Sequence, residues 1–229
     1  MPRIARLVVP DVPHQVTQRG NRRGPIFFAP GDQQIYLGHL TEECRRRGVG
    51  IWAYCLMPNH VHLILTPSDQ DGLRLAIGEA HRRYTNVINR RFDWTGHLFQ
   101  NRFASVPMDD SHFLTAVRYV SLNPVRAGLV RRPEHWRWSS VRAHLEGRPD
   151  GVVDVGPVLL AAPDFEDLIE QDPDDSAYAP LRAAEASGRP LGDSAFVRML
   201  EERLGRPVMR RKGDTIPGGI MSPSNRLGP

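Results

Sequence analysis

The sequence predicts an α+β fold: a ferredoxin-like four-stranded antiparallel sheet with helices on one face, plus a C-terminal helical extension. Segments whose apolar residues recur with the period of a strand and segments with the period of a helix follow one another in the order β-α-β-β-α-β-α over about residues 12–122. The two middle strands are separated only by Pro58 and Asn59, a turn that joins antiparallel neighbours. Beyond Trp138 the periodicity weakens, and only short helices are expected.

Each element is expected from a local pattern of alternation, capping and turn residues. Residues 12–19 alternate weakly and end at the turn signal of Gly20 and the residue after it, which indicates a strand. Asp32 is placed to cap a helix. Asp109 opens an acidic N-terminus for the last helix of the unit, and Pro124 is expected just beyond its end. The expected elements are strand 12–19, helix 32–47, strands 50–57 and 60–66, helix 73–92, strand 98–107 and helix 111–122.

Composition divides the chain into three segments. Residues 1–148 contain the predicted sheet and are expected to form the catalytic domain. Residues 149–205 are expected to form an acidic, mostly helical extension, and residues 206–229 a basic, disordered tail rich in Gly, Pro and Arg. The short helices expected after the sheet are 139–145, 157–162, 165–170 and 194–204.

Positive charge is concentrated in the first part of the chain. Residues 1–150 contain 21 Arg against 13 Asp and Glu, a net charge of +8, whereas residues 151–229 carry a net charge of −4. Only Lys212 is a lysine, a bias that a GC-rich genome explains. Codon bias does not explain why the charge is segregated, and the segregation indicates a polyanionic partner.

Several classes of protein are excluded by composition. Two cysteines, Cys44 and Cys55, cannot build a disulfide framework or a cysteine-based zinc site. No apolar run approaches the roughly 20 residues of a membrane span. The N-terminus lacks the apolar core and cleavage site of a signal peptide. A cytoplasmic protein without a membrane partner is therefore expected.

His60 and His62 open a predicted strand one residue apart. Because side chains alternate along a strand, both histidines are expected on one face, with Val61 and Ile64 on the other. Two imidazoles suit Zn, Mn, Fe or Ni, and an added oxygen ligand favours Mg or Mn. The pair alone supports a metal site and a structural role about equally. No glutamate adjoins it as in hydrolytic zinc motifs, so activation of water is poorly supported.

Tyr119 and Asn123 stand four residues apart on the last helix of the unit and therefore share a face. In one interpretation, Tyr119 is a nucleophile and Asn123 is an oxygen ligand. In the other, which the spacing alone favours, Tyr119 packs in the core and Asn123 is a residue at the C-terminal end of the helix. A helix packed on the sheet would place Tyr119 beside His60 and His62. A metal ion there would polarise a phosphoryl oxygen under attack.

Four segments resemble one family, the Y1-type HUH transposases. They are YCLMPNHVHLI at 54–64, FQNRF at 99–103, YVSLNPVRAGLV at 119–130 and WRWSS at 136–140. The branch that they resemble most is that of the REP-associated tyrosine transposases, relatives of the IS200/IS605 enzymes. The resemblance spans roughly residues 5–145.

The resemblance implies a metal-dependent transposase that cleaves single-stranded DNA next to hairpin-forming repeats through a 5′-phosphotyrosine intermediate. Carried over, Tyr119 is the nucleophile, His60 and His62 are metal ligands, and Asn123 is the third ligand of Mg²⁺ or Mn²⁺. The IS200/IS605 branch commonly has glutamine where this chain has Asn123. Single-stranded or hairpin DNA is the implied partner, and a monomer or a homodimer the implied state.

Several basic and aromatic residues are candidates for DNA binding. Each arginine alone is more often a solvated surface residue, but as a set beside a phosphate-cleaving centre some are expected to hold backbone phosphates. Trp52, Tyr84 and Trp94 could stack on unpaired bases, although core packing is favoured for each. The candidate arginines are Arg19, Arg22, Arg23, Arg82, Arg83, Arg102, Arg118 and Arg126.

Two other functions compete with a transposase. The first is a DNA-binding regulator derived from such an enzyme that no longer transfers strands. The second is a metal-dependent phosphodiesterase that uses water. Only the transposase is expected to form a covalent adduct between Tyr119 and DNA.

Overall fold

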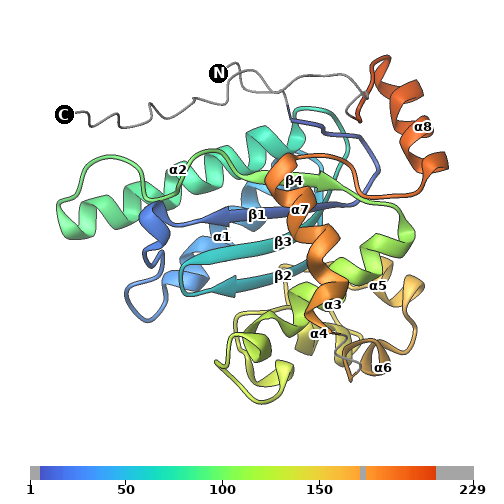
Figure 1. Cartoon of the computed structure of the whole chain (residues 1–229). Helices are drawn as coiled ribbons and strands as arrows, with labels where there is room; N and C mark the ends of the chain where they lie inside the picture. Colours follow the sequence, from blue (N-terminus) through green and yellow to red (C-terminus); the bar gives the residue numbers. More distant parts are fainter. Residues whose placement is uncertain (1–5, 171–173, 210–229) are drawn as a thin grey trace, which may run out of the picture.

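Four strands form one antiparallel sheet in the order β2-β3-β1-β4 (Figure 1). The computed structural model describes residues 6–170 and 174–209. From residue 210 on, the expected basic tail lies outside the described residues. The strands are β1 (His14–Arg19), β2 (Val49–Met57), β3 (His60–Pro67) and β4 (Ala104–Pro107). The predicted α+β class and the four-stranded antiparallel sheet are confirmed.

The strand register sets one row of side chains across the sheet. Thr17 on β1 lies opposite His62 on β3 and, on its other side, opposite Ala104 on β4. His62 also lies opposite Cys55 on β2. Because directly opposed residues of antiparallel strands point to the same face, these four side chains share one face of the sheet.

Two crossover helices cover the other face of the sheet. Helix α1 (Asp32–Arg46) connects β1 to β2, and α2 (Gly72–Phe92) connects β3 to β4. Each connection joins parallel strands that flank an antiparallel neighbour, and the right-handed rule for such crossovers places both helices on the same face. Their apolar side chains pack against residues of β3 such as Val61 and Leu63 in one buried cluster.

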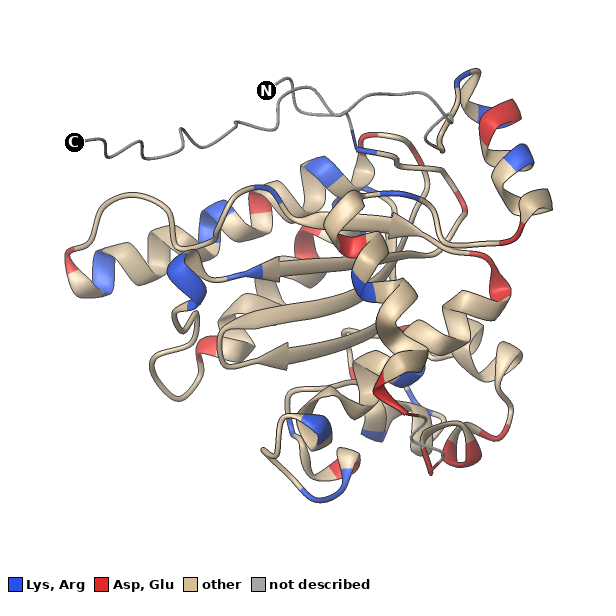
Figure 2. Cartoon of the chain, in the orientation of Figure 1, with Lys and Arg blue, Asp and Glu red and all other residues tan. Residues whose placement is uncertain are grey.

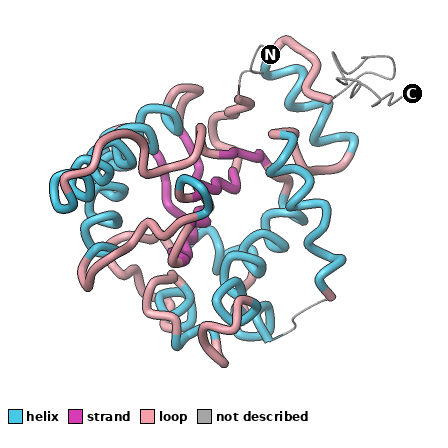
Figure 3. Tube along the Cα trace, turned by 60° about the vertical axis from the view of Figure 1, so that its left-hand side comes forward, coloured by secondary structure: helices cyan, strands magenta, loops and turns pink. Residues whose placement is uncertain are grey.

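Helix α3 (Asp110–Arg126) covers the face that carries His62, so the prediction that the helices lie on one face is wrong for α3. No strand of the sheet follows α3, and the crossover rule therefore does not constrain it. Phe113 and Val117 of α3 pack in a second buried cluster with Ile64. Ile64 thus lies on the same face as the two histidines, which stand two and four residues before it in the strand. The prediction that it lies on the opposite face is wrong, whereas Val61 lies on that opposite face as predicted. Figure 3 shows helices on both sides of the strands.

Two boundaries differ from the predictions for physical reasons. Helix α3 continues through Pro124 to Arg126, because proline in the last turn removes only one backbone hydrogen bond. Strand β4 begins at Ala104, six residues later than predicted. Before it, Phe99 forms a single bridge to Gly20 and residues 98–103 otherwise run as a loop, even though Phe99 and Phe103 are buried.

The extension completes both buried clusters. Val153 and Val155 join the cluster under α1 and α2, and Phe165 and Leu181 join the cluster under α3. The boundary predicted at residue 148 stays a prediction. The helices after α3 are α4 (Val141–Leu145), α5 (Gly156–Ala161), α6 (Phe165–Glu170), α7 (Ala179–Ser187) and α8 (Ser194–Leu204), with short turns η1 (Asn21–Arg23), η2 (Pro133–His135) and η3 (Asp175–Tyr178).

Helix α7 was not expected from the sequence. It crosses the α3 side of the sheet in Figure 1 and contacts β4. Among the described helices, none has the length and apolarity that crossing a membrane requires.

Candidate active site

His60 and His62 project from the same face of β3, as the alternation of the strand predicted. The centroids of their rings lie 4.8 Å apart with the planes nearly perpendicular. His62 is buried, with 2% of its surface exposed, whereas His60 is half-buried at the start of the strand. The pair therefore opens to solvent on the side of His60.

The His60 ring is oriented by its neighbour in the turn. Its Nδ1 lies 2.6 Å from Oδ1 of Asn59, an oxygen that can only accept. Nδ1 therefore carries the proton, and Nε2 is left with a free lone pair. Asn59 also donates from its Nδ2 to the carbonyl oxygen of Arg23, which fixes the amide in this orientation.

The His62 ring is oriented through a threonine and a glutamate. The Thr17 hydroxyl donates to Oε1 of Glu185 at 2.6 Å, so its oxygen is free to accept from Nδ1 of His62 at 3.3 Å. Glu185 comes from α7, and its Oε1 also accepts from Nε2 of Gln15 at 2.5 Å. The Nε2 atom of His62 is buried and has no hydrogen-bond partner among the described residues.

Both histidines are held in the neutral form. Burial, followed by the charge of Arg19, lowers the pKa of His60 to about 4. Burial, followed by the charges of His60 and Arg19, lowers the pKa of His62 well below its ordinary value. Neutral imidazoles whose Nε2 lone pairs are free are the form in which histidine binds a metal.

Tyr119 projects from α3 onto the histidine pair. Its ring centroid lies 5.4 Å from that of His62 in an edge-to-face arrangement and 5.1 Å from that of Tyr178. Burial, followed by the charge of Glu185, raises the pKa of Tyr119, while Arg182 and a hydrogen bond from Asn123 oppose the shift. The phenol is therefore protonated at neutral pH.

The structure brings together the four residues that the sequence predicted for the site. His60 and His62 come from β3, and Tyr119 and Asn123 from α3. Asn123 lies against the Tyr119 hydroxyl, one helical turn away, as the spacing predicted. The Tyr119 ring contacts His62 of the same chain.

The two histidines fit a divalent cation. An unpartnered nitrogen that is completely buried is costly unless it binds something. Among residues 6–170 and 174–209, no group of three or more His, Cys, Asp or Glu side chains is arranged to hold a metal ion. The donors available are therefore two imidazoles with the Asn123 amide oxygen, and the remaining positions would fall to water or to a phosphate oxygen.

Five of the predicted DNA-binding arginines lie in β1, in η1, on α2 or in the loop before β4. Arg19 is half-buried, and its charge acts on both histidines. Arg22 and Arg23 are exposed in η1 with left-handed backbones, φ 54° and 59°, a strained conformation that functional sites often retain. Arg102 is exposed in the loop before β4, and Arg82 on α2 pairs with Glu79. Figure 2 shows basic residues along α2 and in η1, whereas α6 is largely acidic.

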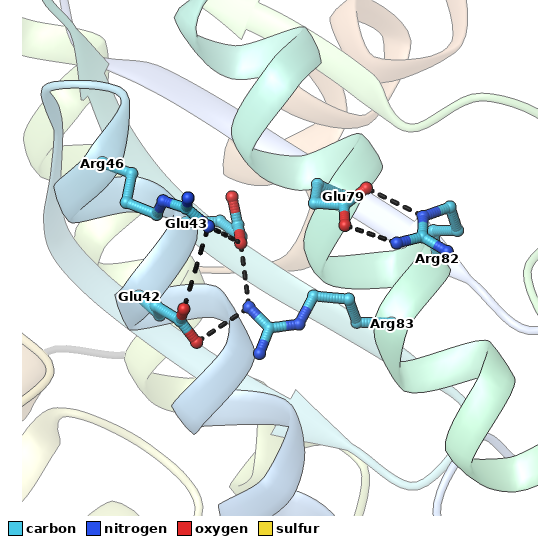
Figure 4. A network of polar contacts seen from close by, with 6 residues as sticks. All are labelled: Glu42, Glu43, Arg46, Glu79, Arg82 and Arg83. Carbon is cyan, nitrogen blue, oxygen red and sulfur yellow. Dashed lines mark hydrogen bonds and ion pairs between the residues drawn. The ribbon is translucent and has the colours of Figure 1, made fainter.

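The other three predicted arginines make contacts that hold the fold together. Arg83 donates to Glu42 and Glu43 of α1 and so joins α1 to α2, as Figure 4 shows. Arg118 donates to the carbonyl oxygen of Leu168 in α6. Arg126 pairs with Asp175 and lies over the ring of Tyr178. Their guanidinium groups are therefore engaged by other parts of the protein.

The structure separates the three aromatic candidates. Tyr84 is fully buried and donates to the carbonyl oxygen of Ile26, and Trp52 packs edge-on against Phe113. Trp94 is 48% exposed and stacks on Phe92 at the end of α2. Core packing thus holds for Tyr84 and Trp52, while Trp94 faces solvent.

Sequence reasoning missed four residues of the site: Thr17, Asn59, Tyr178 and Glu185. A threonine inside a strand and an asparagine in a turn are common, and neither carries a signal of its own. Glu185 and Tyr178 are more than 50 residues from the tyrosine and the histidines in the sequence. Only the docking of the extension on the sheet brings them to the site.

Comparisons with known proteins identify related sequences and a related fold. Residues 11–123 match the family described as IS200-like transposases. A Haemophilus influenzae protein described as a REP-associated tyrosine transposase is 26% identical over 99 residues, an alignment that covers 38% of this chain and 56% of that relative. The chain thus spans little more than half the length of this relative.

A solved structure shares the fold. It is that of a REP-associated tyrosine transposase bound to a REP hairpin, with a TM-score of 0.56 and 21% identity. The similarity covers 68% of this chain and 93% of the other.

Proposed function

Because this chain belongs to the family of IS200-like transposases, we propose that it is a metal-dependent, single-stranded DNA strand transferase that uses Tyr119 as its nucleophile. The observation that carries the proposal is the contact of the Tyr119 ring with His62, whose buried Nε2 has no partner among the described residues. A tyrosine beside two neutral imidazoles that could hold a divalent cation suits transfer of a phosphoryl group to the tyrosine.

In the proposed first step, the Tyr119 oxygen attacks the scissile phosphorus. The new bond joins this oxygen to the 5′-phosphate, the bond from phosphorus to the 3′-oxygen breaks, and the phenol proton balances the 3′-OH that leaves. In the second step, a 3′-OH of another strand attacks the phosphotyrosine and releases Tyr119. The phosphodiester energy is conserved in the covalent intermediate, so rejoining needs no nucleotide cofactor.

His60 and His62, with Asn123, would hold Mg²⁺ or Mn²⁺, and this ion supplies polarisation of the phosphoryl oxygen when bound. Asn123 bonds the Tyr119 hydroxyl, and with Arg126 and Arg182 it favours the phenolate that attacks. Asn59 and the pair of Thr17 and Glu185 fix the two Nδ1 protons, so that both Nε2 atoms keep the lone pairs that would hold the ion.

The proposed substrate is single-stranded DNA next to a hairpin-forming repeat. The solved relative with this fold is bound to a REP hairpin, and the net charge of +8 on residues 1–150 favours a nucleic acid partner. The contact of Tyr119 with His62 inside one chain supports activity as a monomer, and a homodimer that exchanges its tyrosines is not needed to build the site.

The test is to incubate the protein and Mn²⁺ with hairpin-bearing oligonucleotides from its own genomic flanks. We expect a covalent protein–DNA adduct that disappears with Tyr119→Phe and with a chelator. Cleavage without an adduct would identify a phosphodiesterase that uses water. Binding without any cleavage would identify a DNA-binding regulator derived from such an enzyme.

A further inference from the structure

Two adjoining cavities follow the edge of the sheet at β4. The larger, of about 550 Å³, lies between α2 and the loop before β4. The second, of about 420 Å³, lies between the start of β4 and the end of α7. We call them together the β4-edge groove, because both are lined by Arg6, Asn101, Arg102 and Phe103.

The larger cavity is cationic. Four arginines line it, and no carboxylate is among the described residues of its lining; the four are Arg6, Arg74, Arg82 and Arg102. Arg74 pairs with Asp71, which directly precedes α2, and Arg82 pairs with Glu79 of α2, but these pairs are exposed. Exposed ion pairs are worth little, so a phosphate can compete for both guanidinium groups.

Arg6 shows the effect of this crowding of like charges. Its guanidinium lies 3.6 Å from the centre of the Phe103 ring, and its Nε donates to the Phe103 carbonyl oxygen. Burial, followed by the charges of Arg102 and Arg74, lowers the pKa of Arg6 to about 10. An anion in the groove would relieve the repulsion, because it would interact favourably with all three guanidinium groups.

The size and the polar groups of the cavity suit an unpaired nucleotide. Its volume lies within the range of small-molecule sites, roughly 300–1,000 Å³. Asn86 and Asn101 offer exposed amides, the groups that bond the edges of bases. Asn101 has a left-handed backbone, φ 55°, a conformation often retained where a side chain must be aimed at a ligand. A paired base could not enter, because it is stacked inside its duplex.

The groove leads to the histidine pair. The second cavity is lined by Ala104 and Glu185. Ala104 lies opposite Thr17, which lies opposite His62, and Glu185 bonds Thr17. A strand that left the larger cavity along this path would pass round the β4 edge, from the α2 side to the α3 side, and reach the site of Tyr119.

We propose that the β4-edge groove binds the single-stranded DNA segment that leads to the scissile phosphate, with one unpaired nucleotide in the larger cavity. Phosphates would contact Arg102 and Arg74, and the base would lie against Asn86. This proposal rests on the proposed function, since it assumes that the substrate is single-stranded DNA.

A thiol-protection experiment tests the groove without any cleavage. The only native cysteines, Cys44 and Cys55, are 1% and 0% exposed, so a cysteine introduced by Asn86→Cys would be the accessible thiol. Leu160→Cys is the control, because Leu160 is 85% exposed on α5. The full chain is treated with a maleimide in the presence of a chelator. The probe is a DNA hairpin with single-stranded extensions, and a blunt hairpin of the same stem is compared.

We expect the extended hairpin to slow modification of the Asn86→Cys protein several-fold and to leave the Leu160→Cys protein unchanged. The blunt hairpin should protect neither. Suppose that fluorescence anisotropy shows the extended hairpin bound while the Asn86→Cys thiol still reacts at the rate of the free protein. If the wild type also forms the adduct, this result would overturn the groove proposal and leave the proposed function standing. If the wild type neither binds the extended hairpin nor forms the adduct, the proposed function is wrong, and the groove proposal, which depends on it, is wrong as well.

A charge variant gives an independent readout. Arg74→Ala should reduce the slope of log affinity against log salt concentration by about 1, the value for one lost phosphate contact. Arg148→Ala is the matched control, since Arg148 is also exposed and also pairs with a nearby acid, Glu146. Equal slopes for the two variants would contradict the assignment of Arg74 to the groove.

Discussion

The Thr17 hydroxyl links Glu185 of the extension to the histidine that Tyr119 contacts. Replacing Thr17 by valine keeps the branched shape of the side chain and removes the oxygen that accepts from Nδ1 of His62. The His62 ring then loses the partner that fixes its proton on Nδ1. Metal binding at Nε2 should weaken, because either nitrogen of the ring could then carry the proton.

The size of this effect follows from the contacts. Partners that orient metal-binding histidines are worth roughly 10–100-fold in metal affinity. The distance of 3.3 Å from Thr17 to His62 is at the long end for such a bond, so we expect about tenfold, or about 1.4 kcal/mol. Glu185 keeps Gln15 as a donor, and the cost to folding should stay near 1 kcal/mol.

Isothermal titration of chelator-treated protein with Mn²⁺, without DNA, measures this affinity. Thr17→Ser restores a hydroxyl and should recover most of the affinity. Thr115→Val is the control, because the Thr115 hydroxyl bonds only the backbone of its own helix in the structure described, at the Ser111 carbonyl oxygen. The reasoning is refuted if Thr17→Val binds Mn²⁺ as tightly as the wild type, or if Thr17→Ser binds as weakly as Thr17→Val.

Three further predictions follow from the same contacts. Tyr119→Phe should abolish the covalent adduct on denaturing gels and leave DNA affinity unchanged in anisotropy; a remaining adduct would assign the nucleophile elsewhere. DNA affinity should fall steeply as salt rises, because arginines displace counterions, and a flat salt dependence would count against the basic surface. Burial alone would raise the pKa of Asp32, but bonds from the Phe28 N–H, Arg91 and the Ala29 N–H hold it below its ordinary 3.8. This carboxylate therefore stabilises the fold above about pH 3.8, and the stabilisation is lost as the pH falls through its lowered pKa. Urea unfolding should show Asp32→Asn about 2 kcal/mol less stable than wild type at neutral pH, with a difference that shrinks in acid.

The parts of the fold that depend on local patterns could be predicted from the sequence. The order of strands and helices over the first 126 residues is as predicted, because apolar periodicity and turn residues act over a few positions. The meeting of Tyr119 with His62 was also predicted, although it required the assumption that the helix packs on the histidine face. The face on which Ile64 lies could have been predicted correctly from the sequence, because Ile64 stands two residues after His62 on the same strand.

Helix α7 has local sequence signals that predict a helix but not its position in the fold. Pro180 near its start and Gly188 after its end are ordinary helix boundaries, and the segment between them is rich in alanine. The helix itself was therefore predictable. Its place over β4 was not, because that position depends on Leu181 and Ala184 finding the apolar surface shared by Ile64 and α3.

The candidate active site is consequently built from two distant segments of the chain. Residues 11–123, which match the family, contain the histidine pair and Tyr119. The extension adds the Glu185 carboxylate that holds Thr17 and the Tyr178 ring that packs on Tyr119. These contacts orient the His62 ring, proposed to bind the metal, and pack against the proposed nucleophile, and the buried cluster under α3 couples both to the folding of the extension. A change in the extension that leaves every family motif intact is thus expected to alter the proposed strand transfer, because Glu185 and Tyr178, which contact Thr17 and Tyr119, lie outside those motifs.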